Sequence, residues 1–346
     1  IINKDENNTS LIFGYQFTHE YKKLNYQEFR GGKFFGEFFS PNPEDNSIND
    51  LSRFIFDENI FYLKSNLNKL GIIHLQFKQI KWKNTYQIES DLDLIDMLNP
   101  KQSKISINWK KNLSNLSLYF DFDNSLKDSF KSNKIELGIE GNFLKNFKFA
   151  ISGSQFERSP NFNFILHRSQ YESYNWYNDD LIDEKISKVS LDISYKNYVN
   201  LSGEYNIIDN FTFFRESANP LLGEFDFFRR AIPNQSINEI KYYKVKLYSN
   251  IPIGKFSIIN TAQYQKKEQI VELGELSALN VPEWITRNTI MYSSKLFNRS
   301  LDIQTGVTFN YFTKFWANIY NPLISEFVVQ NYIEVGEFPR FDLFFN

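Results

Sequence analysis

The sequence contains no cysteine, and it has only three histidines and two methionines. The absence of cysteine excludes a disulfide framework and any thiolate metal site. His19, His74 and His167 lie too far apart to form a zinc motif, so we expect no bound metal. No apolar run approaches the roughly 20 residues that a transmembrane helix needs. No signal peptide opens the chain, and we interpret it as a fragment that lacks both true termini.

Motifs of catalysis and of nucleic-acid binding are also missing. None of the 14 glycines has the spacing of a phosphate-binding loop or a dinucleotide fingerprint. There is no Gly-x-Ser-x-Gly elbow, and His167 has no catalytic motif beside it. The net charge is −2, with both signs spread along the chain, which excludes the basic stripe of a nucleic-acid-binding protein. We therefore expect no catalytic residue, no cofactor and no nucleic-acid partner.

The sequence is rich in aromatic residues, with 36 Phe and 20 Tyr, although its mean hydropathy is negative. The two properties are compatible when apolar and polar residues alternate. Residues 116–123 show this alternation, as do 135–140 and 189–196. The longest case is residues 301–311, in which the odd positions are mostly apolar and the even positions are polar or glycine. Strict alternation over such lengths predicts strands with one apolar and one wet face.

The predicted strands are joined by short and long connections in turn. The short ones carry Asn, Gly or Lys, which tolerate tight turns, and lie at 66–71, 110–114, 141–146, 196–200, 250–255 and 295–300. The long ones lie at 84–102, 124–133, 154–184, 207–239, 265–284 and 313–340. A separate strand is expected near residues 11–18 and another from Phe341, and residues 91–98 could form a brief helical turn.

This pattern predicts an all-β fold, an antiparallel up-and-down transmembrane β-barrel with short periplasmic turns and long extracellular loops. A closed barrel is the only sheet that spans lipid without an unpaired edge. We expect one barrel domain over residues 1–346 with no separate second domain. It would contain about 13–14 strands and be incomplete at both ends.

If the apolar alternates face lipid, the other face lines a water-filled lumen. Opposed charges there would orient polar solutes and tune ion preference, or would simply neutralise one another. The pore-lining candidates are Asp121, Asp123, Glu136, Glu140, Lys148, Lys188, Asp192, Glu204, Lys244, Lys246, Arg287, Asp302 and Gln304. Aromatic residues at strand ends could form interfacial girdles or could reflect strand propensity alone; they are Trp82, Trp109, Tyr119, Tyr205, Tyr264, Tyr292 and Tyr311.

Two kinds of loop feature remain open. The 154–184 loop mixes arginines and aromatics and could fold inward as a constriction, or could pack on other loops. Its candidate residues are Arg158, Arg168, Tyr171, Tyr174 and Trp176, together with Phe162 and Phe164. Two acidic clusters could bind calcium, but we favour solvated loop charges because neither has an EF-hand pattern. The clusters are Glu89, Asp91, Asp93 and Asp96, and Glu44, Asp45 and Asp50.

From about residue 159 onward the sequence resembles the "putative porin" outer-membrane β-barrels of Bacteroidota. The resemblance lies in residues 159–164, 174–176, 281–283, 286–289, 301–315, 320–323, 326–327 and 336–339. It covers roughly the last 190 residues, whereas the first 150 agree only in style. It implies a barrel in the bacterial outer membrane and passive passage of small solutes. Members of the family begin with a signal peptide and continue into further strands.

Three functions are open from the sequence. The first is a diffusion pore for small hydrophilic solutes, whose partners would be membrane lipid, lipopolysaccharide and those solutes. The second is a non-conducting barrel that anchors a partner complex. The third is a soluble β-protein that binds glycans through aromatic platforms. The oligomeric state and the solute stay undetermined at this stage.

Overall fold

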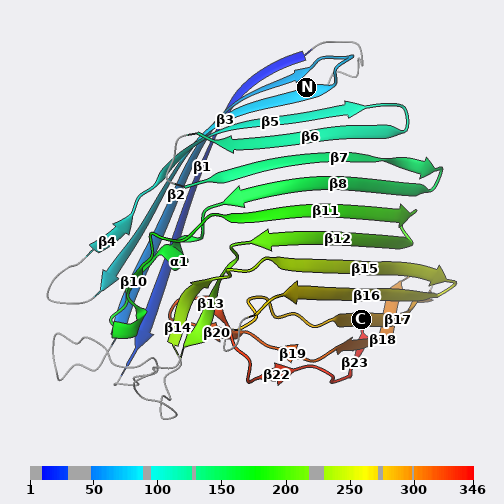
Figure 1. The fold of residues 1–346 in the computed structure, drawn as a ribbon. Helices are drawn as coiled ribbons and strands as arrows, with labels where there is room; N and C mark the ends of the chain where they lie inside the picture. Colours follow the sequence, from blue (N-terminus) through cyan, green and yellow to red (C-terminus); the bar gives the residue numbers. More distant parts are fainter. Residues whose placement is uncertain are drawn as a thin grey trace.

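The computed structural model describes residues 10–29, 48–88, 95–126, 130–217, 230–271, 276–297 and 300–346. These residues form one main antiparallel sheet of 15 strands (Figure 1). Its strands are β1 (Ser10–Glu28), β2 (Ile48–Asn66), β3 (Ile72–Ile88), β4 (Ile95–Leu98), β5 (Lys101–Asn112), β6 (Leu116–Ser125), β7 (Ser132–Leu144), β8 (Phe147–Arg158), β11 (Glu184–Tyr195), β12 (Val199–Asp209), β15 (Ile240–Ile253), β16 (Phe256–Gln269), β17 (Trp284–Leu296), β18 (Leu301–Phe312) and β23 (Arg340–Phe345).

Smaller elements interrupt the long connections. They are α1 (Phe162–Ile165), a 3-10 helical turn (Glu172–Tyr174), the pair β9 (Leu166–His167) and β10 (Trp176–Tyr177), the pair β19 (Phe315–Trp316) and β22 (Glu334–Val335), and a sheet in the order β14-β13-β21-β20. The last sheet consists of β13 (Thr212–Ser217), β14 (Arg230–Gln235), β20 (Ile319–Asn321) and β21 (Glu326–Val329). No helix in the described part of the chain is long and apolar enough to cross a bilayer.

The main sheet is a meander, because strands that follow one another along the chain are hydrogen-bonded neighbours. Tight turns join alternate pairs, and left-handed backbone at Asn68 (φ 48°), Lys196 (φ 49°) and Gly254 (φ 62°) allows the chain to reverse there. Antiparallel order then places all the tight turns at one end of the sheet. Figure 1 shows the turns after β5, β7, β11 and β15 together at that end, with α1, β10, β13, β14 and β20 at the other.

The strand register gathers the apolar alternates on one face. A row of directly opposed residues runs across β2 to β7 through Leu63, Leu75, Ile107, Phe122 and Ile135. The residues between them form the opposite face. There the row across β5 to β12 reads Asn108, Asp121, Glu136, Ser154, Lys188 and Asn206. We call the two sides of the sheet the apolar face and the polar face.

Exposure to solvent is inverted relative to a soluble protein. Leu137 and Val189 on the apolar face are 58% and 56% exposed, whereas the side chains of Glu136 and Glu204 on the polar face are 21% and 18% exposed. Large exposed aliphatic side chains in continuous rows are the surface that lipid covers in a transmembrane strand. The sheet itself therefore has no aliphatic core, and its apolar face is its outer side.

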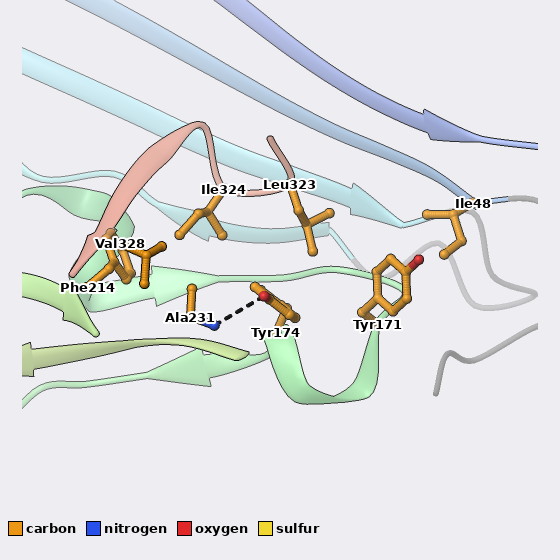
Figure 2. Packing of buried hydrophobic residues seen from close by; sticks show 8 residues of the cluster. All are labelled: Ile48, Tyr171, Tyr174, Phe214, Ala231, Leu323, Ile324 and Val328. Carbon is orange, nitrogen blue, oxygen red and sulfur yellow. Dashed lines mark hydrogen bonds between the residues drawn. The ribbon is translucent and has the colours of Figure 1, made fainter. Parts of the chain in front are cut away.

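The buried hydrophobic core lies instead among the long connections. One cluster comprises Ile48, Tyr171, Tyr174, Phe214, Ala231, Leu323, Ile324 and Val328 (Figure 2). A second comprises Phe213, Ile240, Ala278 and Val329. Both lie at the end of the sheet opposite the tight turns, so the part of the molecule that packs like a globular protein is built from connections rather than from the sheet.

Several expectations need correction. The first strand is longer than predicted and ends at Glu28. The helical turn predicted over 91–98 is wrong where it can be compared, because Ile95–Leu98 pairs with β3 as a strand; residues 91–94 lie outside the described residues. The path of hydrogen-bonded neighbours across the main sheet has 14 strands, compared with the expected 13–14, and β4 pairs with β3 outside that path. Within the described residues β1 pairs only with β2 and β23 only with β18, so closure is not seen.

Two of the residues that could have formed interfacial girdles do not lie on the apolar face. Trp82 and Tyr119 both occupy polar-face positions, because their cross-strand partners are Phe56 and Gly138. Tyr119 covers Gly138, whose missing side chain leaves room for the ring: a Cβ there would lie 2.1 Å from it. The other girdle candidates, Trp109, Tyr205, Tyr264, Tyr292 and Tyr311, lie on the apolar face.

Candidate functional site

All of the predicted pore-lining residues fall on the polar face. The pairing places Asp121 opposite Glu136, Lys188 opposite Asn206, Glu204 opposite Lys244, and Arg287 opposite Asn310. Asp123, Glu140, Lys148, Asp192, Lys246, Asp302 and Gln304 occupy positions of the same parity on their strands. Their common side follows from the two-residue period of a strand.

Charges of opposite sign are joined across neighbouring strands. Glu204 on β12 bridges two lysines, with its carboxylate oxygens 2.9 Å from Lys188 Nζ on β11 and 2.6 Å from Lys244 Nζ on β15. On the β6–β7 side, Lys134 Nζ lies 2.7 Å from Glu136 and 3.7 Å from Asp121. These pairs neutralise part of the polar face and hold its side chains against the wall.

Other charges of the polar face have no partner of opposite charge among the described residues. In the described part of the chain, Lys148, Asp192, Lys246 and Arg287 form no ion pair. Glu140, Lys148 and Asp192 together line a pocket of about 650 Å³ near the tight-turn end of the sheet. The structure thus brings three predicted residues from β7, β8 and β11 to one place.

The insert between β8 and β11, residues 159–183, crosses the polar face. It leaves from β8 but reaches β1, β2 and β3, although β5, β6 and β7 lie between in the sheet. Tyr86 on β3 donates a hydrogen bond of 2.8 Å to the carbonyl of Leu166. The hydroxyl of Tyr171 donates one of 2.5 Å to Glu28 on β1. Because Tyr86 and Glu28 are polar-face residues, the insert lies on that side of the sheet.

Asp50 on β2 is the third anchor of the insert. Its carboxylate accepts hydrogen bonds from the hydroxyl of Ser169 and, at 2.9 Å, from the backbone amide of Gln170. Burial raises the pKa of the Asp50 carboxyl to about 6, an effect that these two hydrogen bonds oppose.

Asp50 lies beyond the part of β2 that crosses lipid. β2 has 19 residues, whereas a spanning strand needs about 9–11. The apolar face of β2 already turns polar at Asp57, which pairs with His19 at 2.7 Å, and Asp50 is seven positions further out. The anchors of the insert therefore belong to the water-exposed end of the barrel wall.

Two further long connections assemble with the insert, one between β12 and β15 and one between β18 and β23. We call residues 159–183, 210–217, 230–239 and 313–339 the loop assembly. Tyr174 is its centre: its hydroxyl accepts hydrogen bonds from the amide of Ala231 at 3.1 Å (Figure 2) and from Asn321 Nδ2 at 2.9 Å. Phe214 on β13 pairs in parallel with Val328 on β21, which joins the second connection to the third.

The predicted constriction residues occupy different places in the loop assembly, some in its buried centre and some at its periphery. Tyr171 and Tyr174 are fully buried, so their rings support the assembly from inside and do not face a passage. Trp176 packs on the same cluster, and Arg168 donates to the carbonyls of His167 and Trp176. Arg158 lies at the base, with Nε 2.8 Å from Glu184. The mixture of arginine and aromatic residues in this segment left open a loop that folds inward as a constriction or one that packs on other loops, and the contacts with residues 231, 321 and 328 are of the second kind. The constriction stays a prediction.

Several residues that hold the insert carried no sequence signal. Glu28 and Ser169 are ordinary polar residues in their local windows, and Asp50 stood out only as part of an acidic cluster that could bind calcium. Ser169 and Asp50 are 119 positions apart. An aromatic cluster on the polar face was also missed; Trp82 contacts Phe56, Phe130 and Phe162 there at ring-centre distances of 6.1, 6.2 and 6.1 Å. Phe162 thereby fastens the start of the insert to the wall.

His167 and the two acidic clusters are the features that could have served catalysis and calcium binding, and only part of them lies within the described residues. His167 packs between the rings of Tyr86 and Trp176, and burial lowers its pKa to about 3, so it is a neutral packing residue. Within the described residues no group of three or more His, Asp or Glu side chains could hold a metal ion. Glu44, Asp45, Glu89, Asp91 and Asp93, and the side chain of Asp96, lie outside the described residues.

Comparison with known proteins supplies the family and the fold. A family model described as "Putative porin" matches residues 2–346, which extends the resemblance over the first 150 residues. The fold is similar to that of the copper transporter OprC, at 10% identity and a TM-score of 0.66, covering 96% of this chain and 53% of that one. It is also similar to a mutant of the ferric enterobactin receptor PfeA from Pseudomonas aeruginosa, at 11% identity, TM-score 0.61, and 94% and 50% coverage.

A third similar structure is the siderophore receptor PirA from Acinetobacter baumannii, at 13% identity, TM-score 0.54, and 89% and 48% coverage. The chain thus spans about half the length of these solved structures. No curated protein sequence matches it.

Proposed function

Because the chain belongs to the family described as "Putative porin", we propose that it forms the wall of a water-filled channel through which small hydrophilic solutes diffuse passively. Its place is the bacterial outer membrane, and the hypothesis of a soluble glycan-binding protein is set aside for that reason. The observation that carries the proposal is the inverted exposure of the sheet, with Leu137 and Val189 outside and the charged row through Glu136 and Lys188 inside.

The polar face suits a diffusing solute better than a single tightly bound one. Its ion pairs, such as Lys188 with Glu204, leave a hydrated surface of balanced charge, and open charges such as Lys246 and Arg287 stand beside them. A surface of this kind offers many weak contacts, which permit both entry and exit of a solute. We assign Asp121, Asp123, Glu136, Glu140 and Asp302 to its acidic part and Lys148, Lys188, Lys244, Lys246 and Arg287 to its basic part.

The loop assembly would set the size limit of the channel. It stands on the polar face and is anchored to Glu28 and Asp50, at the end where outer-membrane barrels carry their long extracellular loops. The tight turns then face the periplasm. A constriction of this type is rigid, because its rings at Tyr171 and Tyr174 are buried and hydrogen-bonded.

Planar-bilayer recording of the full-length protein tests the proposal. We expect discrete conductance steps from barrels whose folding is verified by a heat-dependent gel shift. Absence of steps from verified barrels would reject passive diffusion. The second candidate, a non-conducting barrel that anchors a partner, is motivated by the loop assembly across the polar face, and a stoichiometric co-purified protein would then support it.

A further inference from the structure

The apolar face carries two rows of aromatic pairs on β16 and β17. Tyr264 contacts Trp284 with ring centres 4.9 Å apart, and Phe256 contacts Tyr292 at 5.1 Å. The rows are eight positions apart on each strand, about 26 Å along the strand, or roughly 20 Å along the membrane normal at a tilt of about 40°. Amphipathic rings at this separation fit the two headgroup regions of a bilayer.

Polar residues interrupt the apolar face halfway between these rows. Asn260 and Asn288 are directly opposed on β16 and β17, and each is four positions from both aromatic rows. Ser249 on β15 is the other neighbour of Asn260, and Thr286 is two positions from Asn288 on the same face. We call Ser249, Asn260, Thr286 and Asn288 the amide patch. It lies at the depth where lipid offers no hydrogen bonds.

Among the described residues, the strands from β6 to β12 carry no opposed amide pair in the middle of their apolar face. The apolar face of these strands there consists of Leu118, Phe120, Leu137, Ile139, Ile151, Gly153, Val189, Leu191, Ile193, Leu201 and Gly203. A second opposed amide pair lies on the apolar face of β2 and β3, where Asn59 faces Gln79 and its carbonyl accepts a hydrogen bond of 2.6 Å from the hydroxyl of Tyr15. The pair on β16 and β17 therefore has to be judged by its own hydrogen bonds.

Hydrogen bonds within the patch use only part of its capacity. Asn260 Nδ2 donates to Ser249 Oγ at 3.2 Å, and Asn288 Nδ2 donates to Thr286 Oγ1 at 2.9 Å. Each amide has two N–H donors and a carbonyl acceptor. In the described part of the chain, no donor is recorded for Oδ1 of Asn260 or of Asn288. An amide carbonyl left unpaired in hydrocarbon costs free energy, so the patch favours a polar occupant over lipid.

We propose that the amide patch is the contact surface between two copies of this chain in the outer membrane. A two-fold interface brings the same patch together from both sides, which requires groups that are donors and acceptors at once. Amides and hydroxyls meet this requirement, whereas a patch of one charge would not. Small neighbours such as Ala262 and Ser249 permit close approach of the two walls, as small residues do between membrane helices. The inference rests on membrane location and is independent of conductance.

Cross-linking through introduced cysteines provides a direct test, because the 346 residues contain none. Asn288→Cys and the control Leu137→Cys, on the opposite wall of the apolar face, are made in the full-length protein and treated in native membranes with a short bis-maleimide. We expect a covalent homodimer with Asn288→Cys and at most a tenth as much with Leu137→Cys. Equal yields, no dimer from a heat-shift-verified Asn288→Cys barrel, or an adduct with a different protein would each overturn the proposal.

A second measurement tests the same proposal without cysteine variants, so that a folding defect of Asn288→Cys does not decide the outcome. Native mass spectrometry of the protein in mild detergent should give a dimer for the unmodified chain and a monomer for Asn260→Leu/Asn288→Leu. Asn310→Leu removes an amide from the polar face instead and should remain dimeric. A double variant that stays dimeric, or an unmodified protein that is monomeric by mass spectrometry, contradicts the inference.

Discussion

The backbone amide of Gln170 donates a hydrogen bond of 2.9 Å to the carboxylate of Asp50, although the two residues are 120 positions apart. The contact joins an insert that starts at β8 to a strand near the first edge of the sheet. It fixes the insert over the polar face, and it makes the insert's attachment dependent on the ionisation of one carboxyl group.

Attachment of the insert should weaken as pH rises from about 4 to about 6. The Asp50 pKa is about 6 when the insert is docked, against an ordinary 3.8. Below 3.8 both states are protonated, between the two values only the docked state keeps its proton, and above 6 the full penalty applies, roughly 3 kcal/mol from the pKa difference. Spin-label distances between Glu172→Cys and Asn25→Cys should show more detached insert at pH 7.5 than at pH 4. In an Asp50→Asn background this pH dependence should vanish; its persistence would assign the effect to another group.

Removing the hydroxyl of Tyr174 should loosen the loop assembly. Tyr174→Phe leaves the amide of Ala231 and Nδ2 of Asn321 without their acceptor, which costs about 1–3 kcal/mol. Hydrogen exchange of the Ala231 amide should accelerate by one to two orders of magnitude. Tyr177→Phe, whose side chain is exposed, is the matched control and should leave exchange unchanged. Equal exchange in the two variants would mean that Tyr174 does not hold the assembly together.

Neutralising Glu204 should shift the channel toward anions. Glu204→Gln releases Lys188 and Lys244, which the carboxylate holds at 2.9 and 2.6 Å, and adds net positive charge to the polar face. The reversal potential in a salt gradient should move in the anion-selective direction. Glu268→Gln, which breaks an exposed pair with Lys266 at 3.0 Å outside the polar face and the loop assembly, controls for net charge alone. The lumen assignment fails if the two variants behave alike.

A lysine on the apolar face should destabilise the inserted protein far more than one on the polar face. Leu137→Lys places an ammonium group in lipid and should cost about 2–4 kcal/mol if the residue lies near the midplane. Ser152→Lys, next to Ser190 on the polar face, should cost less than about 1 kcal/mol because water remains available. Denaturant unfolding of the full-length protein in lipid vesicles measures both. A reversed order would assign the faces the other way round.

The alternation of the sequence determined the sheet and its sides. A strand repeats every two residues, so patterns such as Leu301 to Tyr311 specify which residues share a face without knowledge of the partner strand. This is why every pore-lining candidate, from Asp121 to Gln304, falls on the polar face. The alternation of short and long connections likewise determined which end of the sheet carries the loops, since antiparallel order leaves no freedom there.

Only the tertiary structure decided which loops contact one another and which strands they reach. Contacts such as Tyr171 with Glu28 or Phe214 with Val328 join segments more than 100 residues apart, and no local periodicity encodes such a pairing. The girdle prediction for Trp82 and Tyr119 was wrong for a simpler reason: they share the parity of Gln76 and Asp121 on their strands, so the alternation itself puts them on the polar face. The tertiary structure decided what lies against them, Phe162 beside Trp82 and Gly138 beside Tyr119. The amide patch also needed the register, because Asn260 and Asn288 become neighbours only when β16 and β17 are aligned.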